Sequence, residues 1–339
     1  MVSTVLSASL PFCDARVDAP ASAKPVPGVG VLGALRVGIV CNPKSHRNHG
    51  AEYEAGVPGA DSLIVAAPRT RAALAETLVD FAAHRIDLLV IDGGDGTVRD
   101  VLTAAADIWA GSWPRVAVIP SGKTNALAID LGLPADWTLT DALDAARQGR
   151  MIERRPLEIA RVGDAAPPAR GFLFGAGAFA KATELAQHTH RAGAFNNLAV
   201  GLALGWGVAQ TLFGTAKSAW RAGTAMRLAL PGQPADHAQR YLLLASTLGQ
   251  LPMGLKPFGP PREGIRLLAI DAPPRRMMLA TPALLAGSVA PWLARAGYHH
   301  IAAAQFDIAL DEGFILDGEH FPGGALTVRQ GPALAFVTP

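Results

Sequence analysis

Cysteine is scarce in this sequence, since Cys13 and Cys41 are the only two among 339 residues. Two cysteines cannot build a disulfide framework, and these form no Cys-x-x-Cys metal motif, so we expect a reducing, cytoplasmic compartment. Charge is scarce as well: 17% of the residues are charged, and the formal net charge is +2. This balance argues against a nucleic-acid partner held by global charge. The N-terminal residues lack the basic region of a secretory signal, so we expect the protein not to be exported.

The chain is long and apolar enough for two folded domains. Half of its 339 residues are hydrophobic, which excludes a disordered protein. Residues 1–35 are rich in Ala, Pro, Val and Gly without periodicity, and we predict a mobile N-terminal arm. From residue 36 to about 154, apolar β-rich runs such as 86–92 alternate with helical segments such as 69–84. This alternation predicts a parallel, doubly wound α/β domain with ligand sites at the carboxyl ends of its strands.

Beyond residue 155 the pattern changes to short β-like runs separated by Gly and Pro, which predicts a mostly antiparallel second domain over about 155–324. Within it, residues 192–216 carry no charge. That length would allow a membrane span, but the stretch contains Asn196, Asn197, Gln210 and five glycines. We therefore predict a buried or interfacial helix, which would admit acyl chains near a cleft.

Residues 92–97, Asp-Gly-Gly-Asp-Gly-Thr, stand between a predicted strand and a predicted helix. Glycines at such a turn let the backbone approach a ligand closely, and the helix N-terminus presents free N–H groups. The pattern predicts a phosphate-binding loop. The alternative is a tight turn with Asp95 as the helix N-cap. The pattern is not the dinucleotide-binding fingerprint, because no Gly-x-Gly-x-x-Gly can be read here.

Two further loops follow predicted strands at the same sheet edge. Residues 120–125 (PSGKTN) end like a Walker A motif, but its first glycine would have to stand where Ala117 is. What remains is a small-residue turn with a cation and a hydroxyl suited to phosphate oxygens, and residues 42–45 (NPKS) form the third loop. Together the loops predict a polyphosphate pocket, made by Asn42, Pro43, Ser45, Gly93, Gly94, Gly96, Thr97, Gly122, Lys123, Thr124 and Asn125.

Far downstream, residues 314–319 read Phe-Ile-Leu-Asp-Gly-Glu. In an extended strand Asp317 and Glu319 would project to the same face, so they could jointly hold Mg²⁺ or orient a nucleophile. The alternative is a pair of solvated carboxylates in a turn.

In order and spacing, NPKS, GGDGT, PSGKTN, a GAG strand turn and LDGE resemble the diacylglycerol-kinase-like lipid kinases, a family that includes sphingosine and ceramide kinases and, more distantly, the NAD kinases. The resemblance covers about residues 36–335. It implies an N-terminal nucleotide-binding α/β domain, to which the chain returns over about 325–339, and a C-terminal β-sandwich domain that is mostly antiparallel. It also implies an active site in the cleft between them.

The resemblance implies roles for single residues. Gly93, Gly94, Gly96 and Thr97 would contact ATP phosphates, Asn42 and Ser45 would line the nucleotide site, and Asp95 and Asp317 would be the working carboxylates and hold Mg²⁺. Several positions depart from the family pattern: Lys123 replaces a Thr, Ala126 replaces an Asp, and Phe179 replaces a carboxylate. In sphingosine kinases a carboxylate near the last position binds the lipid head, so its absence weakens the case for a free sphingoid base. His46 also stands where the family has a Gly, and an expected acidic cluster is reduced to Glu263, which puts a second, structural magnesium in doubt.

We therefore expect an ATP- and Mg²⁺-dependent kinase that phosphorylates a hydroxyl of a membrane lipid, diacylglycerol-like first and ceramide next. The predicted catalytic residues are Asp95, Asp317 and Glu319, with the proton acceptor left open between the two aspartates. Such an enzyme would be peripherally bound at the inner face of the membrane. Two alternatives are a soluble NAD-kinase-like enzyme and a catalytically inactive lipid- or nucleotide-binding relative, which the departures at Lys123, Ala126 and Phe179 suggest.

Overall fold

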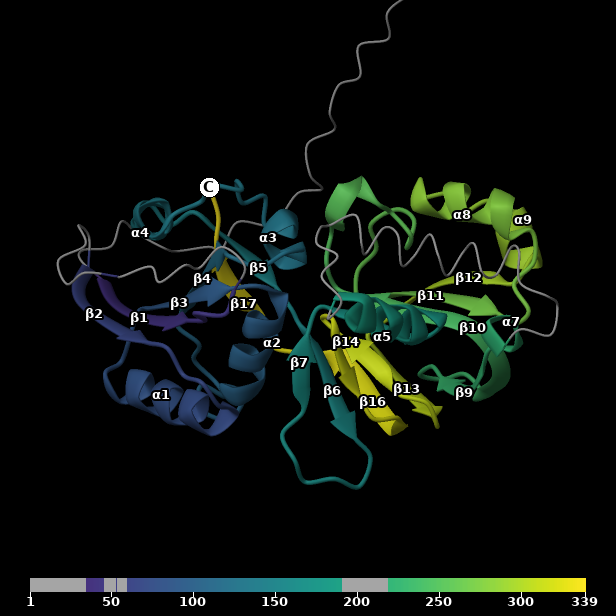
Figure 1. Ribbon diagram of the computed structural model, residues 1–339, viewed down its shortest axis with the longest axis horizontal. Helices are drawn as coiled ribbons and strands as arrows, with labels where there is room; N and C mark the ends of the chain where they lie inside the picture. The colour runs from purple at the N-terminus through teal and green to yellow at the C-terminus, as the bar shows by residue number, and fades with distance from the viewer. Residues whose placement is uncertain (1–34, 46–52, 54–59, 191–218) are drawn as a thin grey trace, which may run out of the picture.

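The computed structural model describes residues 35–45, 53, 60–190 and 219–339, arranged as two domains side by side (Figure 1). The predicted N-terminal arm, apart from Leu35, and the uncharged stretch 192–216 lie outside the described residues. Among the helices of the described part, none is both long and apolar enough to cross a membrane.

The first domain is built on a six-stranded sheet in the order β2-β1-β3-β4-β17-β5. The first four of these strands run parallel, as the alternation of strands and helices predicted. All residues of β3 in the middle of the sheet are buried, which is typical of a sheet covered on both faces. The strands are β1 (Leu35–Cys41), β2 (Ala60–Ala66), β3 (Leu88–Gly93), β4 (Arg115–Pro120), β5 (Met151–Arg154) and β17 (Leu334–Val337).

Helices cover both faces of this sheet (Figure 1). Helix α1 (Arg71–Ala83) buries Leu78 and Phe81, at the helical spacing that its sequence predicted, and begins at Thr70, whose hydroxyl accepts a hydrogen bond from the Ala73 N–H. The other helices are α2 (Asp95–Ala104), α3 (Ala126–Asp130) and α4 (Leu139–Arg147).

The second domain is an 11-stranded sheet in which every pairing is antiparallel. The sheet folds over one apolar core, in which Phe174 stacks on Phe314 and meets Phe306 edge-on, so its two layers pack face to face. The expected fold class is confirmed. The strands are β6 (Leu157–Arg161), β7 (Ala169–Gly171), β8 (Leu173–Gly177), β9 (Thr224–Ala229), β10 (Asp236–Ser246), β11 (Ile265–Asp271), β12 (Tyr298–Ala303), β13 (Gln305–Leu310), β14 (Phe314–Leu316), β15 (Glu319–Phe321) and β16 (Gly324–Gln330).

Short helices complete the second domain. Helices α8 (Met277–Leu285) and α9 (Pro291–Arg295) lie over the outer face of β11 and β12 (Figure 1). The remaining helices are α5 (Ala178–His190), α7 (Ala219–Ala222) and the 3₁₀ turn η1 (Pro252–Gly254).

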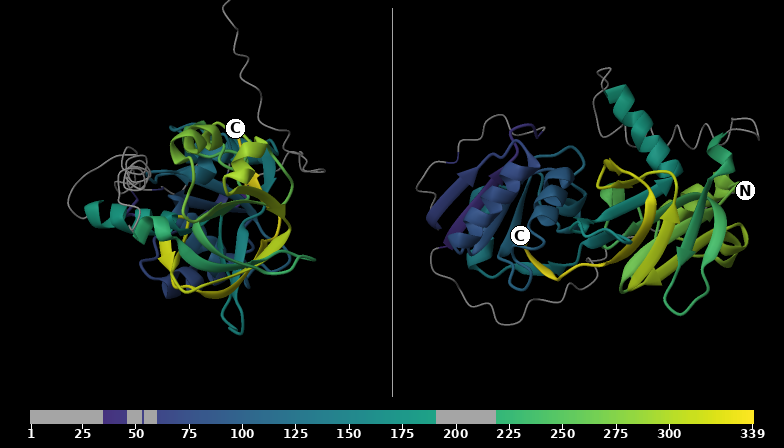
Figure 2. Two further views of the ribbon diagram at one scale, coloured as in Figure 1. Left: turned by 90° about the vertical axis from the view of Figure 1, so that its right-hand side faces the viewer. Right: turned by 90° about the horizontal axis from the view of Figure 1, so that it is seen from below.

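The chain crosses back to the first domain near its C-terminus (Figure 2). Strand β17 pairs with β4 and β5, whereas β16 pairs with β13 and β6 in the second sheet. The returning segment is therefore shorter than the predicted 325–339, because it begins only after Gln330.

An ion-pair cluster stands where the two domains meet. Glu158 is buried and accepts hydrogen bonds from the guanidinium groups of Arg170 and Arg329. Arg170 also stacks over the Trp113 ring of the first domain at 5.7 Å, and its backbone N–H donates to Thr103 Oγ1. Burial alone would raise the pKa of Glu158. The hydrogen bonds from both arginines outweigh this effect and hold the pKa below the usual range.

We predict that Glu158→Gln lowers the free energy of unfolding by about 3 kcal/mol at pH 7, because it leaves the buried Arg170 charge without its partner. The folded pKa of Glu158 is lowered, so its contribution is complete above the ordinary pKa of 4.5 and is lost as the pH falls through the lower folded value. Denaturant unfolding at several pH values should show the deficit shrinking in acid. A deficit that grew in acid would contradict this account.

Candidate active site

The three predicted loops meet at the carboxyl edge of the first sheet. Asn42, at the end of β1, donates from Nδ2 to Thr97 Oγ1 on α2 at 2.9 Å, and its Oδ1 accepts from the Lys44 N–H. This joins the loop after β1 to the loop after β3. Because parallel strands end at the same edge, loops distant in sequence share one site.

Glycine is required where the second and third loops touch. A Cβ on Gly94 would lie 2.9 Å from the Cα of Gly122, and a Cβ on Gly122 would overlap the Cα of Gly94. Asn125 fixes this turn, because its Oδ1 accepts from the Gly122 N–H at 2.9 Å while its Nδ2 donates to the Gly122 carbonyl. Asn125 itself has φ 51°, a left-handed conformation that Asn tolerates better than most residues.

A buried carboxylate holds the loops together through hydrogen bonds. Asp92, the last but one residue of β3, accepts hydrogen bonds from the hydroxyls of Ser121 and Tyr53, the latter at 2.5 Å. Burial, and then this hydrogen bond, raise the pKa of Tyr53. No role was predicted for Asp92, although its place at the start of the glycine-rich motif could have suggested one.

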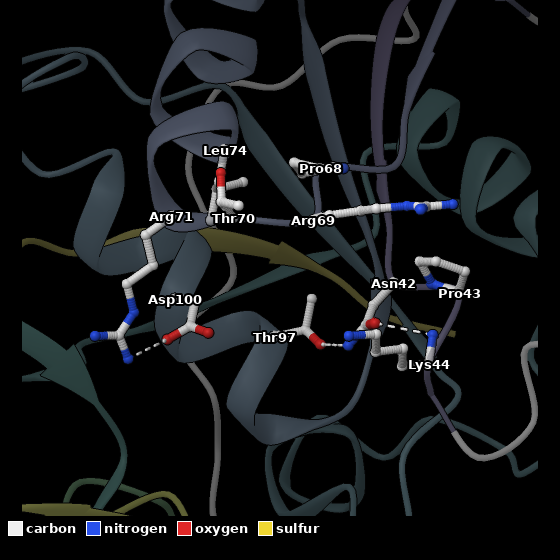
Figure 3. A pocket seen from close by; sticks show the side chains of 10 residues that line it. All are labelled: Asn42, Pro43, Lys44, Pro68, Arg69, Thr70, Arg71, Leu74, Thr97 and Asp100. Atoms are coloured by element: carbon white, nitrogen blue, oxygen red, sulfur yellow. Dashed lines mark hydrogen bonds and ion pairs between the residues drawn. The ribbon is translucent and has the colours of Figure 1, made fainter.

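The loops enclose a cleft made of two adjoining cavities. The larger, of about 450 Å³, is lined by Asn42, Lys44, Ser45, Gly94, Gly96, Thr97, Arg99, Asp100, Gly122 and Lys123. The smaller, of about 200 Å³, shares four of these residues and adds Pro43, Pro68, Arg69, Thr70, Arg71 and Leu74 (Figure 3).

Eight of the eleven predicted cofactor residues line this cleft, and three do not. Gly93 packs under the Thr97 side chain, Asn125 braces the turn, and Thr124 is exposed. Arg69 and Arg71, just before and at the start of α1, were not predicted from the sequence. They follow β2, a strand that was not predicted either, and so lie on a fourth β–α loop at the same edge.

Asp95 caps a neighbouring helix rather than lining the cleft. Its carboxylate accepts from the backbone N–H groups of Ala126 at 2.9 Å and Leu127 at 3.2 Å, the first turn of α3. Burial raises its pKa in spite of these bonds. Ala126, one of the positions that depart from the family pattern, thus contributes its backbone N–H as a donor to Asp95.

Asp317 reaches Asp95 from the second domain. Its carboxylate accepts from the backbone N–H groups of Phe172 and Leu173, at 2.9–3.1 Å. Burial, and then the negative charge of Asp95, raise the pKa of Asp317 to about 7. Two carboxylates from different domains are therefore coupled beside the cleft.

The expectation that Asp317 and Glu319 share a face is wrong. Asp317 and Gly318, with φ 44° and 82°, form the two-residue turn of the β14–β15 hairpin, so the chain is not extended there. Glu319 instead pairs with Arg99, and with Arg71 at 2.8 Å.

Phe179 fills space that a small neighbour leaves open. A Cβ on Gly175 would overlap the Phe179 ring, so the aromatic side chain packs directly on β8. No carboxylate stands at this position to bind a polar lipid head.

Mg²⁺ fits the aspartate pair by charge. Among the described residues, no three His, Cys, Asp or Glu side chains gather as a metal cluster. However, a cation would relieve the repulsion that contributes to the raised Asp317 pKa. Asp95 and Asp317, together with nucleotide phosphates, would hold the ion.

Comparison with known proteins identifies the first domain, because residues 36–160 match the family model of the diacylglycerol kinase catalytic domain. The first domain is therefore similar to the diacylglycerol kinase catalytic domain, and the match ends within β6. It is similar to a probable YegS-like lipid kinase of Klebsiella pneumoniae, with 37% identity over 79 residues, which are 23% of this chain and 24% of that protein. A probable lipid kinase YegS of Salmonella arizonae is 34% identical over 79 residues, 23% of this chain and 25% of its own. The chain thus matches about a quarter of the length of these relatives.

Two solved structures of diacylglycerol kinases have a similar fold. A diacylglycerol kinase of Bacillus anthracis superposes with a TM-score of 0.59 at 15% identity, over 90% of this chain and 97% of that one. A putative diacylglycerol kinase of the same organism gives a TM-score of 0.61 at 16% identity, with the same coverage.

We predict that Gly122→Ala destabilises the protein by about 1–3 kcal/mol, because the new methyl group meets the backbone of Gly94, which cannot rotate away. Gly111→Ala is the matched control, since a Cβ there meets nothing within 4 Å. Denaturant unfolding of both variants measures the difference. Equal stabilities would contradict the close approach of the two loops.

Proposed function

We propose that the protein is an ATP- and Mg²⁺-dependent kinase that transfers the γ-phosphate to a hydroxyl of a membrane lipid, diacylglycerol-like first and ceramide next. The observation that carries this proposal is the convergence of the glycine-rich loops on one cleft, with the pair Asp95 and Asp317 beside it. The family of the first domain and the names of the relatives, probable lipid kinases, support it.

The cleft suits a nucleotide because it offers positive groups and backbone donors together. Lys44, Lys123, Arg69 and Arg71 line it, and the N-terminus of α2 opens onto it through Gly94 and Gly96. Phosphoryl transfer proceeds through a loose transition state, so positioning and neutralisation of charge supply most of the rate. Mg²⁺, when bound, would neutralise the phosphate charge.

The acceptor hydroxyl must lose a proton during transfer. A carboxylate with a pKa near 7 is a competent acceptor at neutral pH, which favours Asp317, while Asp95 raises that pKa and orients α3. The same two aspartates could act in the alternative function, a soluble NAD-kinase-like enzyme, whose acceptor is polar. We also propose that the protein works peripherally at the inner face of the membrane, where such lipid acceptors lie.

Incubation with labelled ATP tests the proposal. Purified protein would receive Mg²⁺ and either micellar diacylglycerol, ceramide or sphingosine, or soluble NAD, with a matched sample in EDTA. Label in diacylglycerol or ceramide that disappears with EDTA supports the proposal. Label in NAD alone would indicate the soluble alternative, and no transfer to any acceptor would indicate an inactive relative.

We predict that Asp317→Asn lowers lipid phosphorylation by ~10²-fold or more, because an amide cannot accept the proton. Asp311→Asn, an exposed aspartate shortly before the same hairpin, should match wild type. Turnover is measured beside thermal melting, since the amide also keeps only one of the two oxygens with which Asp317 holds the Phe172 and Leu173 N–H groups. Near-normal turnover in the variant would remove Asp317 from the mechanism.

Lys123 is expected to contact a β- or γ-phosphate oxygen from its place in the cleft wall. Lys123→Met keeps the stem and deletes the charge, so ATP binding or transfer should weaken by about 1–3 kcal/mol, the scale of a charge-assisted hydrogen bond. Arg150→Met, an exposed cation that lines neither cavity of the cleft, is the control. Calorimetric ATP titration measures both. Equal affinity and equal turnover in the two variants would place the lysine charge outside the mechanism.

A further inference from the structure

Helix α8 presents apolar side chains on both of its faces. Ala280 and Leu284 are buried in the core between the helix and the second sheet. On the opposite face, Met278 and Leu279 are 70% and 68% exposed. A surface helix ordinarily exposes a polar face, so an apolar outer face indicates a surface that meets another apolar phase.

The exposed apolar surface continues beyond the helix. Leu285 and Val289 are 37% and 42% exposed, and Met253 of η1 is 76% exposed. The η1 loop packs on the end of α8, because the Lys256 N–H donates to the Leu285 carbonyl at 2.9 Å. Met253 has φ 61°, so the turn holds this large side chain outward in a conformation that residues with a Cβ rarely adopt.

Positive charge borders this surface. Met277–Ala294 contains no charged residue, while the exposed Arg275 and Arg276 precede it and the exposed Arg295 follows it. The carboxylate nearest in sequence, Asp271, pairs with Arg240 and His299. We call the set Met253, Arg275, Arg276, Met278, Leu279, Leu285, Val289 and Arg295 the α8 surface.

The α8 surface is connected to the candidate active site through α3. Asp95 caps the start of this helix, and Asp130 at its end accepts from the Gln250 N–H at 2.7 Å, just before the η1 loop. Five helical residues span ~7 Å, so the loop that carries Met253 is anchored about one short helix away from the aspartate pair.

We propose that the α8 surface docks the protein on an anionic lipid bilayer. Apolar side chains bordered by arginines match such a membrane, because the apolar groups enter the acyl boundary while the guanidinium groups meet anionic headgroups. The proposal rests on the proposed function in one respect: a kinase for membrane lipids must reach its acceptor at a bilayer.

Vesicle co-sedimentation tests the docking. The full chain would be mixed with phosphatidylcholine vesicles, with and without phosphatidylglycerol, at low salt. We expect wild type to prefer the anionic vesicles, Met278→Glu/Leu279→Glu to bind them at least tenfold more weakly, and Arg275→Gln/Arg276→Gln to lose the preference for anionic lipid. Val162→Glu, at a residue 65% exposed between β6 and β7, is the matched control and should bind like wild type. Thermal melting shows that each variant is folded.

Failure of docking and failure of the proposed function give different results. Phosphorylation of a short-chain acceptor dissolved as monomers should be equal in wild type and in the α8 variants, since none of these residues lines the cleft. If no acceptor is phosphorylated but vesicle binding is as expected, the proposed function is wrong and the docking surface is supported. Equal vesicle binding by Met278→Glu/Leu279→Glu and wild type, or no binding by wild type, would overturn the docking. So would light scattering that shows a wild-type dimer and a monomeric double variant, because the surface would then join two copies.

Discussion

The buried guanidinium of Arg99 is the contact on which the shared site depends. It lies on α2 of the first domain and reaches into the second, where it donates to the Leu316 carbonyl at 3.2 Å, pairs with Glu319 and stacks over Phe321 at 5.8 Å. A buried charge requires such partners, so the hairpin that supplies them is held against α2. Asp317 forms the turn of that hairpin, and it is therefore brought beside Asp95.

Much of the cleft could be predicted from the sequence, because loop motifs directly after apolar strands have their place set by the topology of a parallel sheet. The hydrogen bonds between the Asn125 side chain and the Gly122 backbone could not be predicted, since they depend on an amide that folds back on its own loop. Arg71 was missed because β2, ADSLIVA, is half-exposed and gives a weak strand signal. Once that strand is overlooked, the loop after it has no predicted position.

The hairpin at Asp317 shows a different kind of error. An Asp-Gly pair between apolar residues is a strong signal for a two-residue turn, so the turn alternative deserved more weight than the extended conformation. The turn sends Asp317 to the backbone of Phe172 and lets Glu319 pair with Arg99, which is 220 residues away. No local sequence pattern indicates a partner so far away in the chain, so the ion pair between Glu319 and Arg99 could not be predicted.

The insertion of β17 between β4 and β5 has a consequence for the order of folding. The parallel sheet cannot be completed until the ribosome has made the whole second domain, because its fifth strand in spatial order follows that domain in the chain. Meanwhile the apolar edge of β4 is open, and open strand edges recruit other chains. The nascent first domain must either tolerate a provisional pairing of β4 with β5 or be shielded. The late closure therefore makes the completion of the first sheet depend on synthesis of the whole two-domain fold.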